Sequence, residues 1–150
     1  MHHGLTGILL GLLAGTAHAA VPSAFEHQVY QAMVEHNFHG DWHSDCSRLP
    51  HGGALRQWWR LGQGQLDIVE TRYSDDDCQS PSGFATHHYG YQAAAPALDA
   101  QGQHHYPLHL TAEADAAQIY YLQPQDGSLL VTGLAQDARL LLSQTGGQHD

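Results

Sequence analysis

Two cysteines, each at the edge of a segment with strand character, constrain this chain more than any other feature. Cys46 and Cys78 are its only cysteines. Such a pair is typical of a small extracellular β-barrel with one end closed by a cross-link, and favours a binding module over an enzyme. In an oxidising compartment the two thiols most simply form one disulfide. The alternative, a pair of metal-ligand thiols, lacks the Cys-x-x-Cys spacing of common zinc sites.

The N-terminus indicates the compartment. A short apolar run from Leu5 to Leu13 precedes the small-residue sequence Ala17-His18-Ala19. This arrangement predicts a signal peptide over residues 1–19 and a secreted or periplasmic protein. The run is too short to cross about 30 Å of hydrocarbon, and no later stretch is apolar enough, so no transmembrane segment is expected after cleavage.

Charge narrows the range of partners. The chain has 15 acidic and 5 basic residues, for a net charge of −10. This acidity argues against nucleic acid and anionic membrane surfaces as partners. The length after cleavage suits a single domain. We expect a lead-in and helix over residues 20–38, a barrel over residues 39–145 and a flexible tail over residues 146–150.

A helix is predicted directly after the lead-in. Ser23 and Glu26 have the spacing of a capping box, in which each side chain bonds the other residue's backbone N–H. Apolar residues follow at helical spacing and predict the buried face: Phe25, Val29, Ala32 and Met33. The helix is expected to end near Asn37.

Everything after Gly40 has the pattern of strands joined by turns. Apolar and polar residues alternate with a period of two, and turns containing Gly, Pro, Asp or Ser separate the segments. The expected strands are residues 41–46, 54–61, 66–73, 84–91, 106–112, 119–122, 128–133 and 139–142. Residues 111–117 are ambiguous, because their Ala and Glu content also suits a helical turn. The prediction is an all-β, antiparallel barrel of about eight strands, closed or nearly closed. Its interior is either filled by side chains or wide enough for one small ligand.

The first strand resembles the opening of a lipocalin-type barrel. Gly40-Asp41-Trp42 follows a short helix, as the Gly-x-Trp motif does in that group. The resemblance implies that an arginine near the end of the barrel stacks on this tryptophan and closes the base. Arg139 is the residue placed to contact Trp42 in this way, through a cation–π interaction.

A closer resemblance, to the APCDD domain, covers about Phe38 to Tyr91. Its two motifs map onto Gly40, Trp42, Ser44 and Cys46, and onto Tyr73, Asp75, Cys78 and Pro81. The family is named for adenomatosis polyposis coli down-regulated proteins, which are secreted or membrane-anchored Wnt antagonists in animals. The resemblance implies a lipocalin-like barrel with a disulfide and an apolar cavity that accepts lipid. With one such domain and no anchor, this chain is predicted to be a bacterial exported relative.

Several aromatic residues and two arginines are candidates for contact with a hydrophobic or acyl-bearing ligand. The expected lining residues are Trp59, Phe84, Tyr89 and Tyr91, of which Phe84 has the opposite strand parity to the two tyrosines. Arg56 or Arg72 would pair with an acidic head group. Trp58 is expected to point outward between Arg56 and Arg60. There it either marks a partner surface or is covered by the arginines.

Histidine offers a second interpretation. The 14 histidines include the candidate ligands of a metal site: His36, His39, His87 or His88, His104 or His105, and His109. Adjacent strand residues point to opposite faces, however, so exposed histidines explain the pattern equally well. Asp75-Asp76-Asp77 lacks the spaced ligands of a calcium loop and is expected to form a turn. No catalytic set, cofactor or metal ligand is assigned.

The sequence therefore predicts an exported, non-catalytic barrel that binds a hydrophobic small molecule or lipid. Two alternatives stay open. One is a periplasmic histidine-based metal-binding protein, and the other is a protein-interaction or inhibitor module acting on another exported protein. An empty apolar interior would favour the ligand carrier, whereas a filled interior with a surface patch around Trp58 would favour the interaction module.

Overall fold

The computed structural model describes residues 23–112, 118–134 and 138–145. The predicted signal peptide, the predicted tail and most of the ambiguous segment 111–117 lie outside these residues. No helix within the described part of the chain is long and apolar enough to cross a membrane.

Helix α1 runs from Ala24 to Phe38, and its capping box is confirmed. The Ser23 hydroxyl accepts a hydrogen bond from the Glu26 backbone N–H at 3.2 Å, and the Glu26 carboxylate accepts one from the Ser23 N–H at 2.9 Å. Two of the four orphan donors at the helix start are thereby satisfied.

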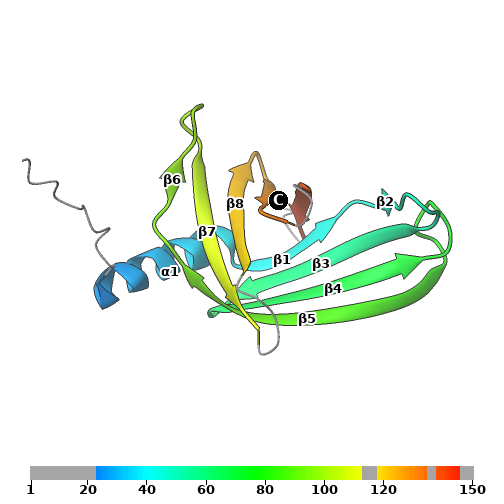
Figure 1. The fold of residues 1–150 in the computed structure, drawn as a ribbon, viewed down its shortest axis with the longest axis horizontal. Coiled ribbons are helices and arrows are strands. Elements are labelled where there is room, and N and C mark those ends of the chain that lie inside the picture. Colours follow the sequence, from blue (N-terminus) through cyan, green and yellow to red (C-terminus); the bar gives the residue numbers. More distant parts are fainter. Residues whose placement is uncertain (1–22, 113–117, 135–137, 146–150) are drawn as a thin grey trace, which may run out of the picture.

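The expected buried face of α1 was wrong. Phe25 is 73% exposed and Val29 is 40% exposed, whereas Val34 and Phe38 are buried, with Tyr30 packed beside them. Residues 30, 34 and 38 form a different stripe at helical spacing. Figure 1 shows the reason: the first turns of α1 project beyond the strands, so only the second half of the helix meets the barrel.

The structure confirms all eight expected strands and adds two of two residues each. The ten strands are β1 (Gly40–Ser44), β2 (Ser47–Arg48), β3 (Ala54–Gly62), β4 (Gln65–Tyr73), β5 (Pro81–Ala93), β6 (Ala97–Leu98), β7 (His104–Thr111), β8 (Gln118–Gln125), β9 (Ser128–Thr132) and β10 (Leu140–Gln144). All pair antiparallel with their neighbours. The two unexpected strands, β2 and β6, are too short for a periodic pattern to reveal them.

Eight of these strands form a closed ring, as predicted. Their order is β1-β3-β4-β5-β7-β8-β9-β10, and β1 closes it by pairing with both β3 and β10. In register terms, Trp42 lies opposite Trp59 on one side and opposite Gln144 on the other. Within the ring each of the eight strands pairs with a neighbour on both sides, so the ring itself has no open edge.

The barrel interior is filled with apolar side chains. One hydrophobic cluster joins Val34 and Phe38 of α1 to inward-facing residues of the ring. Trp59 stacks on Tyr120 with ring centroids 5.7 Å apart. The cluster also contains Trp42, Leu61, Leu66, Ile68, Tyr91, Ala93, Leu108, Leu110, Leu122, Leu129, Val131 and Leu142. Complete burial of this kind stabilises by about 1.5–3 kcal/mol for each large side chain.

Three strands extend past the ring and form what we call the arm, residues 45–57 and 69–88. β5 pairs with β7 only from Gly90 to Ala93, so the earlier part of β5 has β4 alone as its neighbour. Consecutive residues 84–88 are all exposed, which means that neither face of β5 is covered there. Figure 1 shows β3, β4 and β5 running out together to a tip beside β2.

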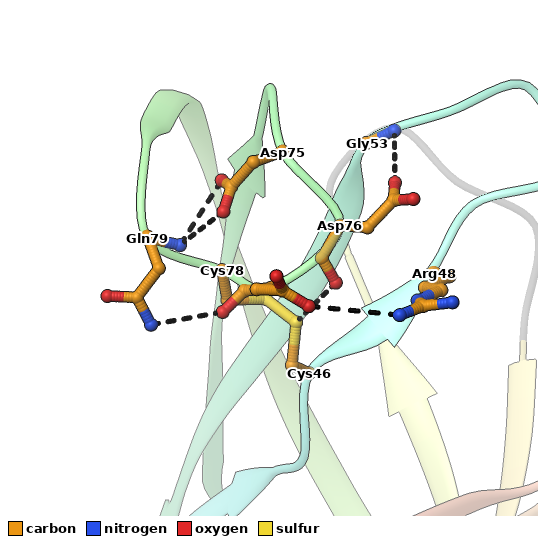
Figure 2. A network of polar contacts seen from close by, with 8 residues as sticks. Cys46, Arg48, Gly53, Asp75, Asp76, Cys78 and Gln79 are labelled. Carbon is orange, nitrogen blue, oxygen red and sulfur yellow. Dashed lines mark hydrogen bonds and ion pairs between the residues drawn. A yellow bond between two sulfur atoms is a disulfide. The ribbon is translucent and has the colours of Figure 1, made fainter.

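The tip of the arm holds the disulfide, and Cys46–Cys78 is confirmed. Figure 2 shows Asp75 and Asp76, two of the three consecutive aspartates, close to it. Asp75 accepts hydrogen bonds from the backbone N–H groups of Gln79 and Ser80 at 2.9 and 2.8 Å. Asp76 accepts one from the Gly53 N–H at 3.2 Å, and Asp77 lies 3.8 Å from Arg48. These carboxylates therefore serve a turn, as the sequence predicts.

Candidate binding surfaces

The six residues expected to contact a ligand do not converge on one site. Register places Trp59, Tyr89 and Tyr91 toward the interior, with Arg72 on the same side of the sheet but exposed along the arm. Phe84 and Arg56 lie on the opposite, outer face, where Phe84 is 80% exposed. Its opposite parity, visible in the sequence, accounts for this separation.

Tyr91 is committed to a contact with the helix. Its hydroxyl donates to the Glu35 carboxylate at 2.5 Å, and the same oxygen accepts the Gly64 N–H at 2.9 Å. Burial opposes the charge on Glu35, but these hydrogen bonds outweigh it and hold the pKa of the carboxyl below its usual value. Burial and the Glu35 charge raise the pKa of Tyr91, so its hydroxyl stays protonated. This pair fastens α1 to the barrel.

Trp59 is likewise engaged within the protein. Its indole N–H donates to the Gln57 side-chain carbonyl at 2.8 Å. The Gln57 backbone N–H donates in turn to the Ser44 hydroxyl at 2.8 Å. With its ring stacked on Tyr120 and its one donor satisfied, Trp59 has the contacts of a core residue.

Four cavities lined by described residues lie around the barrel rather than within it. The four have volumes of about 670, 380, 300 and 180 Å³. Of the buried cluster, only Leu61 and Ala93 contribute to any of their linings. The inward-facing side chains of the described ring residues are almost completely buried, which agrees with the filled-interior form, one of the two forms that the strand count allows.

The expected Trp42–Arg139 contact at the base is not formed, and this prediction is corrected. The Trp42 indole N–H donates to the Phe38 carbonyl at 2.9 Å in a buried setting, while Arg139 is exposed. Trp42 lies opposite Gln144, five residues along β10 from Arg139, which is about 17 Å of strand. Helix α1 covers Trp42 instead. Gly40 has a structural role, as expected, because its backbone φ of 123° favours glycine over other residues.

The outer face of the sheet carries an exposed tryptophan. Trp58 is 42% exposed, as its parity predicts, and borders a depression of about 300 Å³. We call this surface the Trp58 face; it comprises Asp41, His43, Trp58, Arg60, Asp67, Val69, Thr86 and His88. The neighbouring strands β1, β3, β4 and β5 each contribute side chains to it.

Arg60, one of the two arginines beside Trp58, binds a carboxylate rather than covering the indole. Arg60 forms an ion pair with Asp41 at 2.7 Å, and the Trp58 indole N–H donates to the same carboxylate at 3.4 Å. The ring near Trp58 is that of His43, with centroids 6.1 Å apart. The hydrogen bond from Arg60 lowers the pKa of Asp41, so this pair stays charged. Asp41 therefore fixes the indole of Trp58 through its N–H.

The histidines are distributed among separate partners. His88 lies 2.7 Å from Asp67, His87 lies 3.7 Å from Glu70 and His105 lies 3.0 Å from Asp99. Within the described ranges, no three His, Cys, Asp or Glu side chains come close enough together to hold a metal ion. The metal-binding alternative therefore receives no geometric support from those residues.

The largest of the four cavities was not predicted as a binding site, although two of its lining residues, His105 and Arg139, were candidates for other roles. It is lined by Asp99, Gln101, Gln103, His105, Gln123, Gln125, Leu130, Thr132, Gly133, Ala138 and Arg139. Glutamines in turns and on outward strand positions carry no ligand pattern of their own. Register was needed to bring the 99–105 segment and the ends of β8 and β9 together.

Comparison of the chain with protein-family models, curated proteins and solved structures finds no match. The resemblance to the APCDD domain therefore stays a prediction. The barrel and its disulfide are established by the structure itself.

Proposed function

We propose that this chain is an exported, non-catalytic binding protein that contacts another exported protein through the Trp58 face. The observation that carries the proposal is the exposed indole of Trp58 beside a depression, on a barrel whose interior is filled. Tryptophan is among the residues most often dominant in protein interfaces. The disulfide supports an oxidising compartment.

The charges on this surface indicate the chemistry of the partner. Arg60 pairs with Asp41, and His88 pairs with Asp67, so these charged side chains of the Trp58 face already have partners within the protein. Arg56 is exposed on the same outer face and has no ion pair among the described residues. A complementary partner would therefore present an apolar side chain to Trp58 and Val69, and a carboxylate to Arg56.

A hydrophobic or acyl-bearing ligand inside the barrel is the second candidate. Trp59 and Tyr89 do lie on the inward side of the sheet. This function requires the packed interior to open, and the cavities around the barrel supply no such space. It therefore ranks below the surface proposal.

The test compares Trp58→Ala with Tyr121→Ala, a matched control because Tyr121 is 38% exposed on β8, away from the Trp58 face. Chemical cross-linking would first identify the partner of the exported protein. The purified partner would then be titrated with wild type and with each variant, and calorimetry would give each Kd. Loss of a central tryptophan costs about 2 kcal/mol, roughly a 30-fold weaker Kd. Tyr121→Ala should leave Kd unchanged.

Equal affinity of the two variants for the partner would exclude the Trp58 face as the contact. Native mass spectrometry of protein recovered from its own compartment tests the second candidate function, a ligand inside the barrel. A non-covalent adduct that is lost on organic extraction would favour the interior ligand over the protein partner.

A further inference from the structure

The largest cavity is a built polar pocket on the outside of the barrel, and we propose that it binds a polyhydroxylated carboxylate, an acidic sugar. Its volume is about 670 Å³, within the range of small-molecule sites. This inference is independent of the Trp58 face, because it rests on different strands.

The position of the pocket follows from strand parity. Leu122, Leu129 and Val131 face the core and are fully buried. Their neighbours Gln123 and Leu130 lie opposite each other in the β8–β9 register and face outward. The β6–β7 hairpin borders this outward surface on one side, where Figure 1 shows it rising beside β8. The segment around Arg139 borders it on the other.

One wall carries a fixed negative charge. Asp99 accepts hydrogen bonds from the backbone N–H groups of Gln101 and Gln103, each at 2.9 Å, and lies 3.0 Å from His105 Nε2. The backbone bond from Gln103 and the bond from His105 lower the pKa of Asp99. The carboxylate is therefore an ionised, immobile acceptor for hydroxyl groups.

The same contact determines which ring nitrogen of His105 donates to Asp99. An ionised Asp99 only accepts, so His105 Nε2 carries the proton in this pair. In the neutral imidazole Nδ1 is then an acceptor. The side chain of His105 is 23% exposed. In that neutral form, His105 Nδ1 can accept a hydrogen bond from a ligand hydroxyl while Asp99 holds the imidazole ring in place.

Amides line the centre of the pocket. Gln103 and Gln123 hydrogen-bond each other through their side chains, and Gln101 and Gln125 complete the set. An amide both donates and accepts, as a sugar hydroxyl does, so four amides suit a ligand with several hydroxyls. Leu130 and Ala138 add apolar surface for the C–H groups of the ring.

A cation lies at the rim opposite Asp99. Arg139 is exposed, lines the pocket and makes no ion pair with any described residue. A guanidinium binds a carboxylate through two parallel hydrogen bonds. Arg139 therefore selects an acidic sugar over a neutral one, which is a different role from the base closure that its resemblance to other barrels implied.

The test is a calorimetric titration of the whole exported protein with D-glucuronate and, separately, with D-glucose. We expect saturable glucuronate binding that Arg139→Gln weakens about tenfold, the loss expected for about 1.4 kcal/mol of charge-assisted bonding. Arg48→Gln is the matched control, an exposed arginine at the tip of the arm that should leave glucuronate binding unchanged. Circular dichroism would establish that each variant is folded.

Two outcomes would overturn the proposal. One is the absence of saturable glucuronate binding to the wild-type protein, and the other is equal glucuronate affinity in wild type and Arg139→Gln. Chemical-shift changes that map to Gln101, Gln125 and Leu130, rather than to the Trp58 face, would support the assignment to this pocket.

Discussion

The ring and the arm share three strands, β3, β4 and β5, yet the two regions are held together differently. Within the ring, β3, β4 and β5 contribute fully buried side chains such as Trp59 and Leu66. Along the arm, the same β5 exposes side chains on both faces, and the tip is fixed by a disulfide and by aspartates bonded to backbone N–H groups.

The comparison separates two ways of holding a sheet. Hydrophobic burial supplies the stability of the ring, because its interior excludes water from whole side chains. The arm buries little, so a cross-link and capped turns must limit its freedom. Three predictions follow from this difference.

The largest effect is expected from removing an aromatic ring in the two regions. Trp59→Ala should lower the free energy of unfolding by about 3–5 kcal/mol, because it leaves a cavity in the core. Phe84→Ala should change it by less than about 0.5 kcal/mol, because Phe84 is already in water. Urea denaturation measures both. A loss at Phe84 as large as that at Trp59 would show that the arm is covered after all.

Removing the disulfide should act next most strongly, and mainly on the arm. Replacing Cys46 and Cys78 by alanine is expected to cost up to about 3–4 kcal/mol for a loop of this length. Hydrogen exchange should accelerate at the amides of residues 69–73 and change less at Leu108 and Leu122 in the ring. Uniform acceleration across both regions would argue against a separately held arm.

The smallest effect concerns the polar contact between α1 and the ring. Glu35→Gln should cost about 1–2 kcal/mol at neutral pH, because the charged acceptor for Tyr91 and Gly64 is lost. The folded-state pKa of Glu35 lies below its ordinary value of 4.5, so its contribution is present above that pH and disappears as pH falls through the folded pKa. Unfolding measured from pH 7 to pH 3 should show the two proteins converging.

A double-mutant cycle with Tyr91→Phe provides the control for that contact. If Tyr91 and Glu35 stabilise each other, the double variant should lose less than the sum of the single losses. Strictly additive losses would indicate that the hydroxyl and the carboxylate act independently.

The ring could be predicted from the sequence, since alternation and turn residues mark every long strand. The cysteine pair and the outward direction of Trp58 also followed from position and parity. The helix face could not, because α1 carries two apolar stripes and only docking decides between Phe25 and Phe38. Burial of one stripe against the barrel end is a tertiary choice that helical periodicity does not encode.

The candidate sites were less predictable than the fold. Arg139 was expected at the base because a motif suggested it, whereas it directly precedes β10, five residues from Gln144, the partner of Trp42. The outer pocket depends on Asp99, Gln123 and Arg139, which lie far apart in sequence and share no common motif. Such a set becomes visible only when strand pairing brings its members together.

The pairing that closes the ring also sets the order in which the protein can fold. Trp42 pairs with Gln144, and about a hundred residues separate them in the sequence. Pairing β1 with β10 therefore costs loop entropy, and we expect it to occur late in folding. Until β10 arrives, β1 and β9 each present an open edge that could pair with another molecule. Premature release of a chain lacking β10 would therefore favour aggregation over a smaller stable barrel.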